Sequence, residues 1–186
     1  MALQDAILAA LAYGESSGYD LAKSFEVTVA NFWSATPQQI YRELDRMKAA
    51  GLIEARAIQQ EKRPTKHMFS LTDSGRATLH AFTIQKPKPT AIRDELLVQV
   101  EAMELGDIPS VRTNVQDKLA ASETKLKHHE RTRDYLLAGR TAEAYLAQED
   151  RLGPYLTLAR GIAFEQETIR WCEFVLNTLS ARHPAP

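Results

Sequence analysis

The chain has 186 residues, 44% of them hydrophobic, and its 23 basic residues nearly balance its 24 acidic ones. This length allows one substantial domain or two small ones with a real core. No apolar run approaches the roughly 18 to 20 residues of a membrane span, and the N-terminal sequence lacks the layout of a signal peptide. We therefore expect a cytoplasmic protein without membrane contact.

Several chemistries are disfavoured by residue counts and motifs. The single cysteine, Cys172, can form neither an intramolecular disulfide nor a cysteine metal cage. No phosphate-binding glycine loop, nucleophile elbow or zinc-binding helix motif occurs. The adjacent His128 and His129 diverge by roughly 100° on a helix and cannot share a metal without other ligands. We therefore expect no enzyme activity, no metal and no cofactor.

Two short helices are expected at the N-terminus. Apolar residues keep helical spacing from Leu3 to Leu11. The second helix begins at an S-x-x-D capping arrangement of Ser17 and Asp20, and its apolar side continues to Trp33. Only two residues separate it from the next predicted element.

A third helix has the most strongly marked start in the chain. Thr36 is an N-cap type of residue, Pro37 suits the first helical position, and Gln39 completes a capping box. Three short helices with tight connections are typical of a helix-turn-helix unit.

The third helix has one apolar and one polar face. Ile40, Leu44 and Met47 form the apolar stripe. The polar face consists of Gln38, Tyr41, Arg42, Asp45 and Arg46. Such a face can contact a DNA groove, but it is equally typical of an ordinary solvated surface helix.

A β-hairpin is predicted directly after the third helix, with strands at 52–58 and 67–71. Its tip holds three cations, Lys62, Arg63 and Lys66. Like charges repel, so this cluster is easier to explain with an anion nearby, although a merely solvated loop explains it about as well. Beside the arginines of the third helix, the tip suggests one electropositive edge.

The first domain is expected to end soon after the hairpin. Thr72 caps a further helix in which Phe82 can pack inward. The two prolines and two lysines at 85–90 predict a linker. We therefore expect one domain at 1–84 and a second at 91–186.

The second domain is expected to be all helical. Apolar spacing predicts a helix from Ile92 to Met103 and a long helix from Val111 to Gly139. A short segment from Thr141 precedes a kink or break at Gly153-Pro154. The last and most regular helix runs from Tyr155 to Leu179.

The last helix carries two apolar strips, and Glu165 is the one polar member of its main seam. We expect one strip to pack on the long helix of the same chain and the other on a second subunit. In the alternative, all seams close within one chain as a small bundle. The residues expected at the dimer contact are Leu119, Leu126, Ile162, Ile169, Cys172, Leu176 and Leu179.

The first 82 or so residues resemble the PadR family of bacterial winged-helix transcriptional regulators. The motifs that carry the resemblance are ILAAL at 7–11, SGYDL at 17–21, QIYREL at 39–44, GLI at 51–53, RP at 63–64, MFSLT at 68–72 and GR at 75–76. The chain departs from the family pattern at Lys62, where Gly is usual, and at Met68, where an aromatic residue is commoner. After Thr90 the layout is similar to the longer C-terminal dimerisation domain of the two-domain branch.

This resemblance implies a mainly α fold, with an N-terminal winged helix-turn-helix, a two-stranded wing and an all-α C-terminal domain. It also implies a homodimer that binds a pseudo-palindromic operator in double-stranded DNA as a repressor, with relief by a small aromatic or hydrophobic effector. The competing hypothesis is a winged-helix protein-interaction module that binds no DNA, which the near-zero net charge keeps open.

The expected DNA contacts follow from side-chain chemistry. Gln38 and Arg42 suit base edges, because Gln can pair with adenine and Arg with guanine. Tyr19 is a candidate by resemblance only, and a half-buried packing role is equally plausible for it. The remaining expected contacts are Thr36, Gln39, Tyr41, Arg46, Lys62, Arg63 and Lys66. The aromatic candidates for an effector site, which are more often core residues, are Phe32, Trp33, Phe164 and Trp171.

Overall fold

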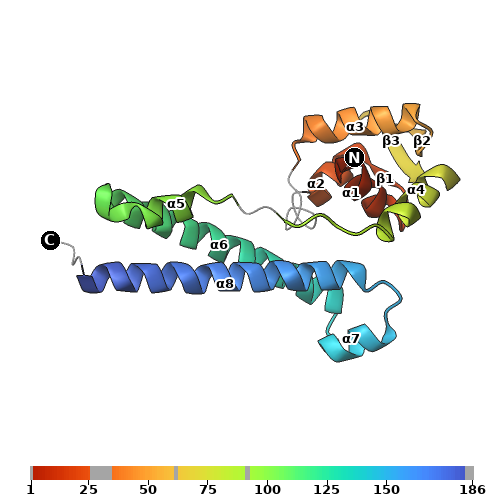
Figure 1. Ribbon diagram of the computed structural model, residues 1–186. Helices are drawn as coiled ribbons and strands as arrows, with labels where there is room; N and C mark the ends of the chain where they lie inside the picture. The colour runs from red at the N-terminus through yellow and green to blue at the C-terminus, as the bar shows by residue number, and fades with distance from the viewer. Residues whose placement is uncertain (1, 26–34, 61–62, 91–92, 183–186) are drawn as a thin grey trace. The chain divides into compact units, whose positions relative to one another are not determined.

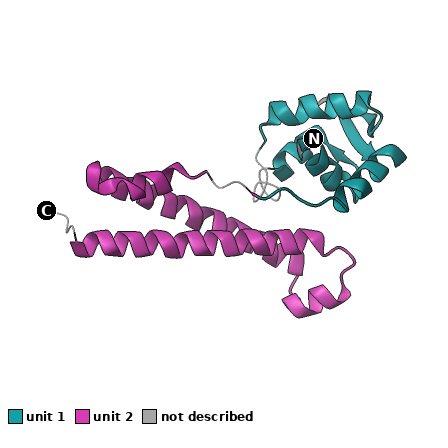
Figure 2. Cartoon of the chain, in the orientation of Figure 1, with its two compact units in different colours: residues 1–89 teal, residues 90–186 magenta. Residues whose placement is uncertain are grey.

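The computed structural model describes residues 2–25, 35–60, 63–90 and 93–182 (Figure 1). The chain forms two compact units, residues 1–89 and residues 90–186 (Figure 2). No helix within the described ranges is long and apolar enough to cross a bilayer.

In its described residues, the first unit combines four helices with a small sheet (Figure 1). Strand β1 pairs with β3, and β3 pairs with β2, in both cases antiparallel. The sequence predicted β2 and β3 but missed β1, because two serines show no alternation of apolar and polar residues. The elements are α1 (Ala2–Leu11), β1 (Ser16–Ser17), α2 (Gly18–Ser24), α3 (Pro37–Ala49), β2 (Ile53–Gln60), β3 (Arg63–Leu71) and α4 (Asp73–Thr83).

The core of this unit joins α1, α2, α3 and the sheet. It is formed by Ile7, Leu8, Leu11, Leu21, Phe25, Ile40, Leu44, Met47, Ile53, Phe69 and Leu71. The expectation that Phe82 packs inward is wrong, since its side chain is 46% exposed. The close contact of helix α4 is instead made by Gly75 with the backbone of Leu52, where a Cβ would collide with the Leu52 carbonyl oxygen. A glycine is required there because two stretches of backbone come too close for a side chain.

The second unit contains helices only, in the residues that the structure describes. Helices α6 and α8 make its most extensive packing contact. Helix α6 ends at Ala138 and Gly139, both with positive φ, and Gly153-Pro154 begins α8 rather than kinking a longer helix. The elements are α5 (Glu95–Glu101), the 3₁₀ turn η2 (Met103–Leu105), α6 (Ile108–Leu137), α7 (Ala142–Gln148) and α8 (Gly153–Arg182).

The seam between α6 and α8 has an apolar half and a polar half. Val111, Val115, Cys172, Val175 and Leu179 form the apolar half. Of the seven residues expected at a dimer contact, Ile162, Cys172 and Leu179 are buried within this one chain, and the other four are half-buried. To this extent the apolar seam closes inside the chain, as the bundle alternative expected.

The polar half of the seam contains four buried side chains, Ser122 and His129 on α6 and Glu165 and Thr168 on α8. His129 is only 6% exposed, and its Nδ1 has no hydrogen-bond partner among the described residues. Burial lowers the pKa of His129, whereas the Glu165 carboxylate acts to raise it; His128 and Lys125 act to lower it further. His129 is therefore held in its neutral form.

We predict that His129 makes the protein less stable in mild acid. The folded-state pKa lies below the ordinary value of 6.5, so the unfolded chain takes up a proton first as the pH falls. The free energy of unfolding should therefore decrease as the pH falls from 7.5 to 5.5, and less so in His129→Leu, as denaturant titrations would show. His128→Gln removes one of the neighbours that lower the pKa of His129 but keeps the buried imidazole, so it should reduce the dependence less than His129→Leu does. Equal pH slopes in wild type and His129→Leu would contradict the prediction.

Candidate DNA-binding surface

The start of α3 is fixed by the capping box that the sequence predicts. The Gln39 amide N–H donates to Thr36 Oγ1 at 3.3 Å, and the Thr36 amide N–H donates to Gln39 Oε1 at 2.8 Å. Pro37 occupies the first turn. The side chains of Thr36 and Gln39 are thus engaged at the helix terminus, and what they contribute to the surface is the position of α3.

The polar face of α3 points to solvent because the opposite face is fully buried. Ile40, Leu44 and Met47 are at most 1% exposed, whereas Gln38 and Arg42 are exposed. Neither Gln38 nor Arg42 has a hydrogen-bond or ion-pair partner among the described residues. Two hydrogen-bonding side chains, about one turn apart on the same face, are therefore available to an external partner.

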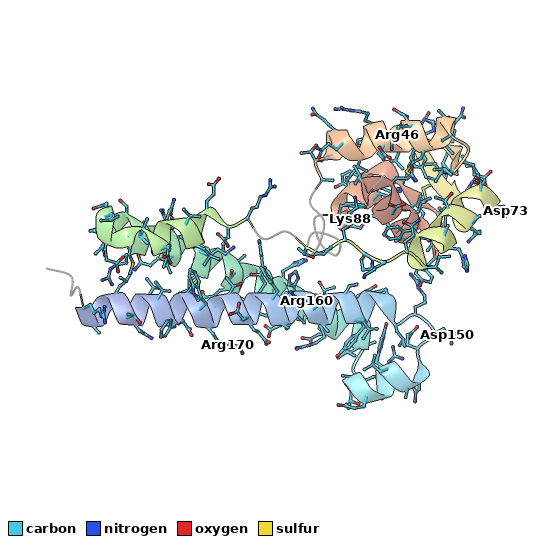
Figure 3. All side chains as sticks on the ribbon, viewed as in Figure 1. Arg46, Asp73, Lys88, Asp150, Arg160 and Arg170 are labelled. Carbon is cyan, nitrogen blue, oxygen red and sulfur yellow. The ribbon has the colours of Figure 1, made fainter. Side chains whose placement is uncertain are left out.

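Arg46 also lies on this exposed face of α3 (Figure 3). Its Nη2 is 2.7 Å from Glu43 Oε1, in an i, i+3 ion pair. The arginine side chain remains 60% exposed. A pair of this kind is worth little in water, so Arg46 can exchange Glu43 for a phosphate.

Tyr41 is seated on α2 rather than projecting freely. Its side chain is 46% exposed, and its ring lies against the backbone of Gly18. Tyr19, at the start of α2, is 69% exposed, which does not fit the half-buried packing role considered for it. Both tyrosines thus border the surface, and Tyr41 is held there by a close contact with Gly18.

The β2–β3 hairpin, the wing of this unit, is tied to α2. Lys66 Nζ on β3 is 3.0 Å from Asp20 Oδ2, and the Ser17 hydroxyl donates to the same oxygen at 2.6 Å. The Ser17 hydroxyl and then Lys66 hold the pKa of Asp20 below its ordinary value. Lys66 is therefore not a free cation, and it joins the wing to α2.

Other predicted site residues are only partly described. Lys62, Phe32 and Trp33 lie outside the described residues, and Arg63 begins β3 without a described side chain. In the second unit, Trp171 is half-buried against the apolar seam. Phe164 on α8 is 48% exposed, with the guanidinium carbon of Arg160 at 5.6 Å from its ring centroid (Figure 3 places Arg160 on α8).

Sequence reasoning missed the roles of Gly18 and Asp20 at this surface. The S-G-Y-D motif contains both residues, but it gave only a helix start and a family resemblance. The described residues contain no group of three His, Cys, Asp or Glu side chains suited to a metal. The surface is thus built from a capped helix, a seated tyrosine and a tethered hairpin, which together define a winged helix-turn-helix protein.

Two family models match the chain. The Transcriptional regulator PadR-like family matches residues 7–81, and Virulence activator alpha C-term matches residues 92–180. The negative transcriptional regulator PadR of Bacillus subtilis is 31% identical over 175 residues, which cover 94% of this chain and 95% of that protein. A probable transcriptional regulator of Mycobacterium tuberculosis is 32% identical over 192 residues, which cover 98% of this chain and 100% of that protein.

Solved structures agree with these sequence matches. Bacillus subtilis PadR in complex with operator DNA has a TM-score of 0.76 and 29% identity, covering 96% of this chain and 99% of that one. The same protein in complex with p-coumaric acid has a TM-score of 0.71 and 29% identity, covering 96% and 95%. The chain belongs to the PadR-like family of transcriptional regulators, in the branch with a long helical C-terminal part.

We predict that the capping box sets the stability of α3. Thr36→Ala removes one side-chain acceptor and should lower the free energy of unfolding by about 1 kcal/mol, measured by denaturant titration. Gln38→Ala truncates an exposed neighbour that has no hydrogen bond to another described residue, and it should cost less than about 0.5 kcal/mol. Equal losses in the two variants would show that the cap does not hold the helix start.

Proposed function

We propose that this regulator represses transcription by placing the outward face of α3 in the major groove of its operator. The observation that carries the proposal is the pair of exposed donors, Gln38 and Arg42, which have no partner among the described residues and lie on a helix whose start and rotation are both fixed. The likeness to Bacillus subtilis PadR, solved on operator DNA, supports it. It also favours DNA binding over a protein-interaction module, and a regulator over an enzyme.

Roles within the interface follow from side-chain chemistry. Arg42 has the fork geometry for the O6 and N7 atoms of guanine, and Gln38 can make paired bonds to adenine. Thr36, Gln39, Tyr41 and Arg46 lie nearer the edges or start of α3 and suit phosphates or the placement of the helix. From the wing and the start of α2, Lys62, Arg63, Lys66 and Tyr19 would contact the DNA backbone, with Lys66 exchanging the Asp20 carboxylate for a phosphate.

The same proposal includes a homodimer that reads a pseudo-palindrome. Away from the α6 seam, α8 leaves large apolar side chains in solvent, among them Leu156, which is 54% exposed, and Phe174, which is 68% exposed. Exposed apolar residues on one helix mark a surface that a second copy can cover. Two-fold symmetry would then present two α3 helices to the two half-sites of the operator. We place the protein in the cytoplasm.

We predict that Arg42 carries sequence preference. Arg42→Ala should weaken binding to the DNA upstream of the protein's own coding sequence by about 1 to 3 kcal/mol. It should also reduce the preference for this DNA over random DNA. Arg76→Ala removes the same charge from an exposed site on α4 and should weaken both DNAs alike. Anisotropy titrations at fixed salt measure both. Should Arg42→Ala and Arg76→Ala behave identically, Arg42 reads no base.

We further propose that a small aromatic or hydrophobic compound releases the DNA. The Bacillus subtilis PadR structure with p-coumaric acid motivates the compound class. Within this chain, the exposed Phe164 ring beside the Arg160 guanidinium offers an aromatic and a cationic group to an aromatic acid. Trp171, Phe32 and Trp33 remain further candidates for lining the site.

We predict that p-coumaric acid raises the apparent Kd for the upstream DNA in a saturable manner, because ligand binding would favour the state that does not bind DNA. Hexanoic acid, an acid without a ring, is the matched control and should have no effect. Phe164→Ala should reduce the response without changing DNA affinity in the absence of ligand. If p-coumaric acid and a panel of phenolic acids and hydrophobic drugs all leave the Kd unchanged, the effector proposal fails and the DNA-binding proposal stands.

A further inference from the structure

The first turn of α2, from Ser17 to Asp20, contacts α3 on one side and the wing on the other. Gly18 faces α3 through the ring of Tyr41. Ser17 pairs with Met68 of β3, and Asp20 forms the ion pair with Lys66 of the same strand. Both elements that we place on DNA therefore touch the same short piece of backbone.

Gly18 accommodates the ring of Tyr41 because it has no side chain. A Cβ at Gly18 would lie 2.5 Å from Tyr41 Cε1, 3.2 Å from Cδ1 and 3.3 Å from Cζ, and these are its three nearest atoms. Gly18 is not among the described glycines with positive φ, so its backbone suits any L residue. The obstacle to a side chain at this position is thus the tyrosine ring.

The start of α2 is held in place by other contacts. Ser17 caps the helix by accepting from the Asp20 amide at 3.1 Å, and the Asp20–Lys66 pair ties it to the sheet. Tyr41, by contrast, is 46% exposed, and its ring can turn about two side-chain bonds. An added methyl group at Gly18 would therefore displace the tyrosine ring rather than α2.

We propose that Gly18 is a positioning residue for DNA binding. Because Gly18 has no side chain, the ring of Tyr41 packs directly on its backbone and is fixed at the edge of the recognition face of α3. We call this contact between Gly18 and the Tyr41 ring the seat. The proposal rests on the proposed function of α3. Tyr41 precedes Arg42 and lies one turn beyond Gln38. When the ring packs on Gly18, the tyrosine hydroxyl is held in one position, from which it can bind a phosphate. When the ring is displaced, it occupies space that Gln38 and Arg42 need to reach the bases.

A double-mutant cycle tests the seat. Gly18→Ala should raise the Kd for the upstream DNA about tenfold, because Tyr41 loses its position. In a Tyr41→Ala background the same Gly18→Ala change should cost less than about twofold, because the atoms that the new methyl would meet are gone. Equal costs in the two backgrounds, or no cost in the wild-type background, would overturn the proposal.

The melting temperature distinguishes a positioning role of Gly18 from a loss of folding. Alanine favours a helix over glycine, so Gly18→Ala should leave the Tm near that of wild type while DNA affinity falls. If the affinity falls only in proportion to a lost Tm, the role is structural and the proposal fails. Tyr41→Phe keeps the ring on Gly18 without the hydroxyl, so adding Gly18→Ala to it should still weaken binding, by less than in wild type because no hydroxyl contact is lost, but by more than in Tyr41→Ala.

The seat can also be observed without DNA. A nuclear Overhauser contact between the Gly18 α-protons and the Tyr41 ring protons is expected in the wild-type protein, and its absence would overturn the proposal. If the contact is present but wild type shows no preference for its upstream DNA, the proposed function fails while the seat is real. The two failures are therefore distinguishable.

Discussion

Burial of the apolar stripe of α3 is the constraint on which the recognition surface depends. Ile40, Leu44 and Met47 are almost completely removed from water, each contributing on the order of 1.5 to 3 kcal/mol. That burial fixes the rotation of the helix about its axis, and the capping box fixes where the helix begins. With both determined, the directions of Gln38 and Arg42 follow, although neither side chain has a hydrogen bond or ion pair with another described residue.

The second unit depends on the packing of α6 against α8. The two halves of the seam between these helices differ in polarity. The half around Val115 and Cys172 is dry and apolar, whereas the half with His129 and Glu165 buries polar groups at a cost. Polar groups at a helix seam can specify register where an apolar seam would tolerate slippage. The apolar residues that α8 leaves exposed are separate from this seam, so a dimer contact through them would not compete with the fold of the chain.

Local signals made much of this architecture predictable. The caps at Thr36 and Thr72, the apolar period of α3 and the alternation in β2 and β3 each act over a few residues and each agree with the structure. Features that depend on distant partners were not predictable in this way. Strand β1 exists because two serines meet β3, and Tyr41 rests on a glycine 23 positions earlier, which no helical or strand period encodes.

The last helix shows why periodicity has this limit. Its apolar residues, spaced three and four apart, can pack on a helix of the same chain as well as on one of a second subunit. Cys172 and Leu179 were therefore expected at a dimer contact, although they are buried in the cluster with α6 of the same chain. Likewise, Phe82 lies on the apolar side of a short helix, but its own unit, as far as the structure describes it, leaves the residue 46% exposed. Side-chain spacing shows which face is apolar, and only the tertiary structure shows what covers it.

The central claim is that α3 reads base sequence. Selection of bound DNA from a random pool by the full chain, followed by sequencing of successive rounds, tests it most directly. We expect enrichment of an inverted repeat, with half-sites about one helical turn apart and guanine or adenine at the positions that reach Arg42 and Gln38. A pool that is retained but stays random in sequence would contradict it, because binding would then rest on phosphate contacts alone.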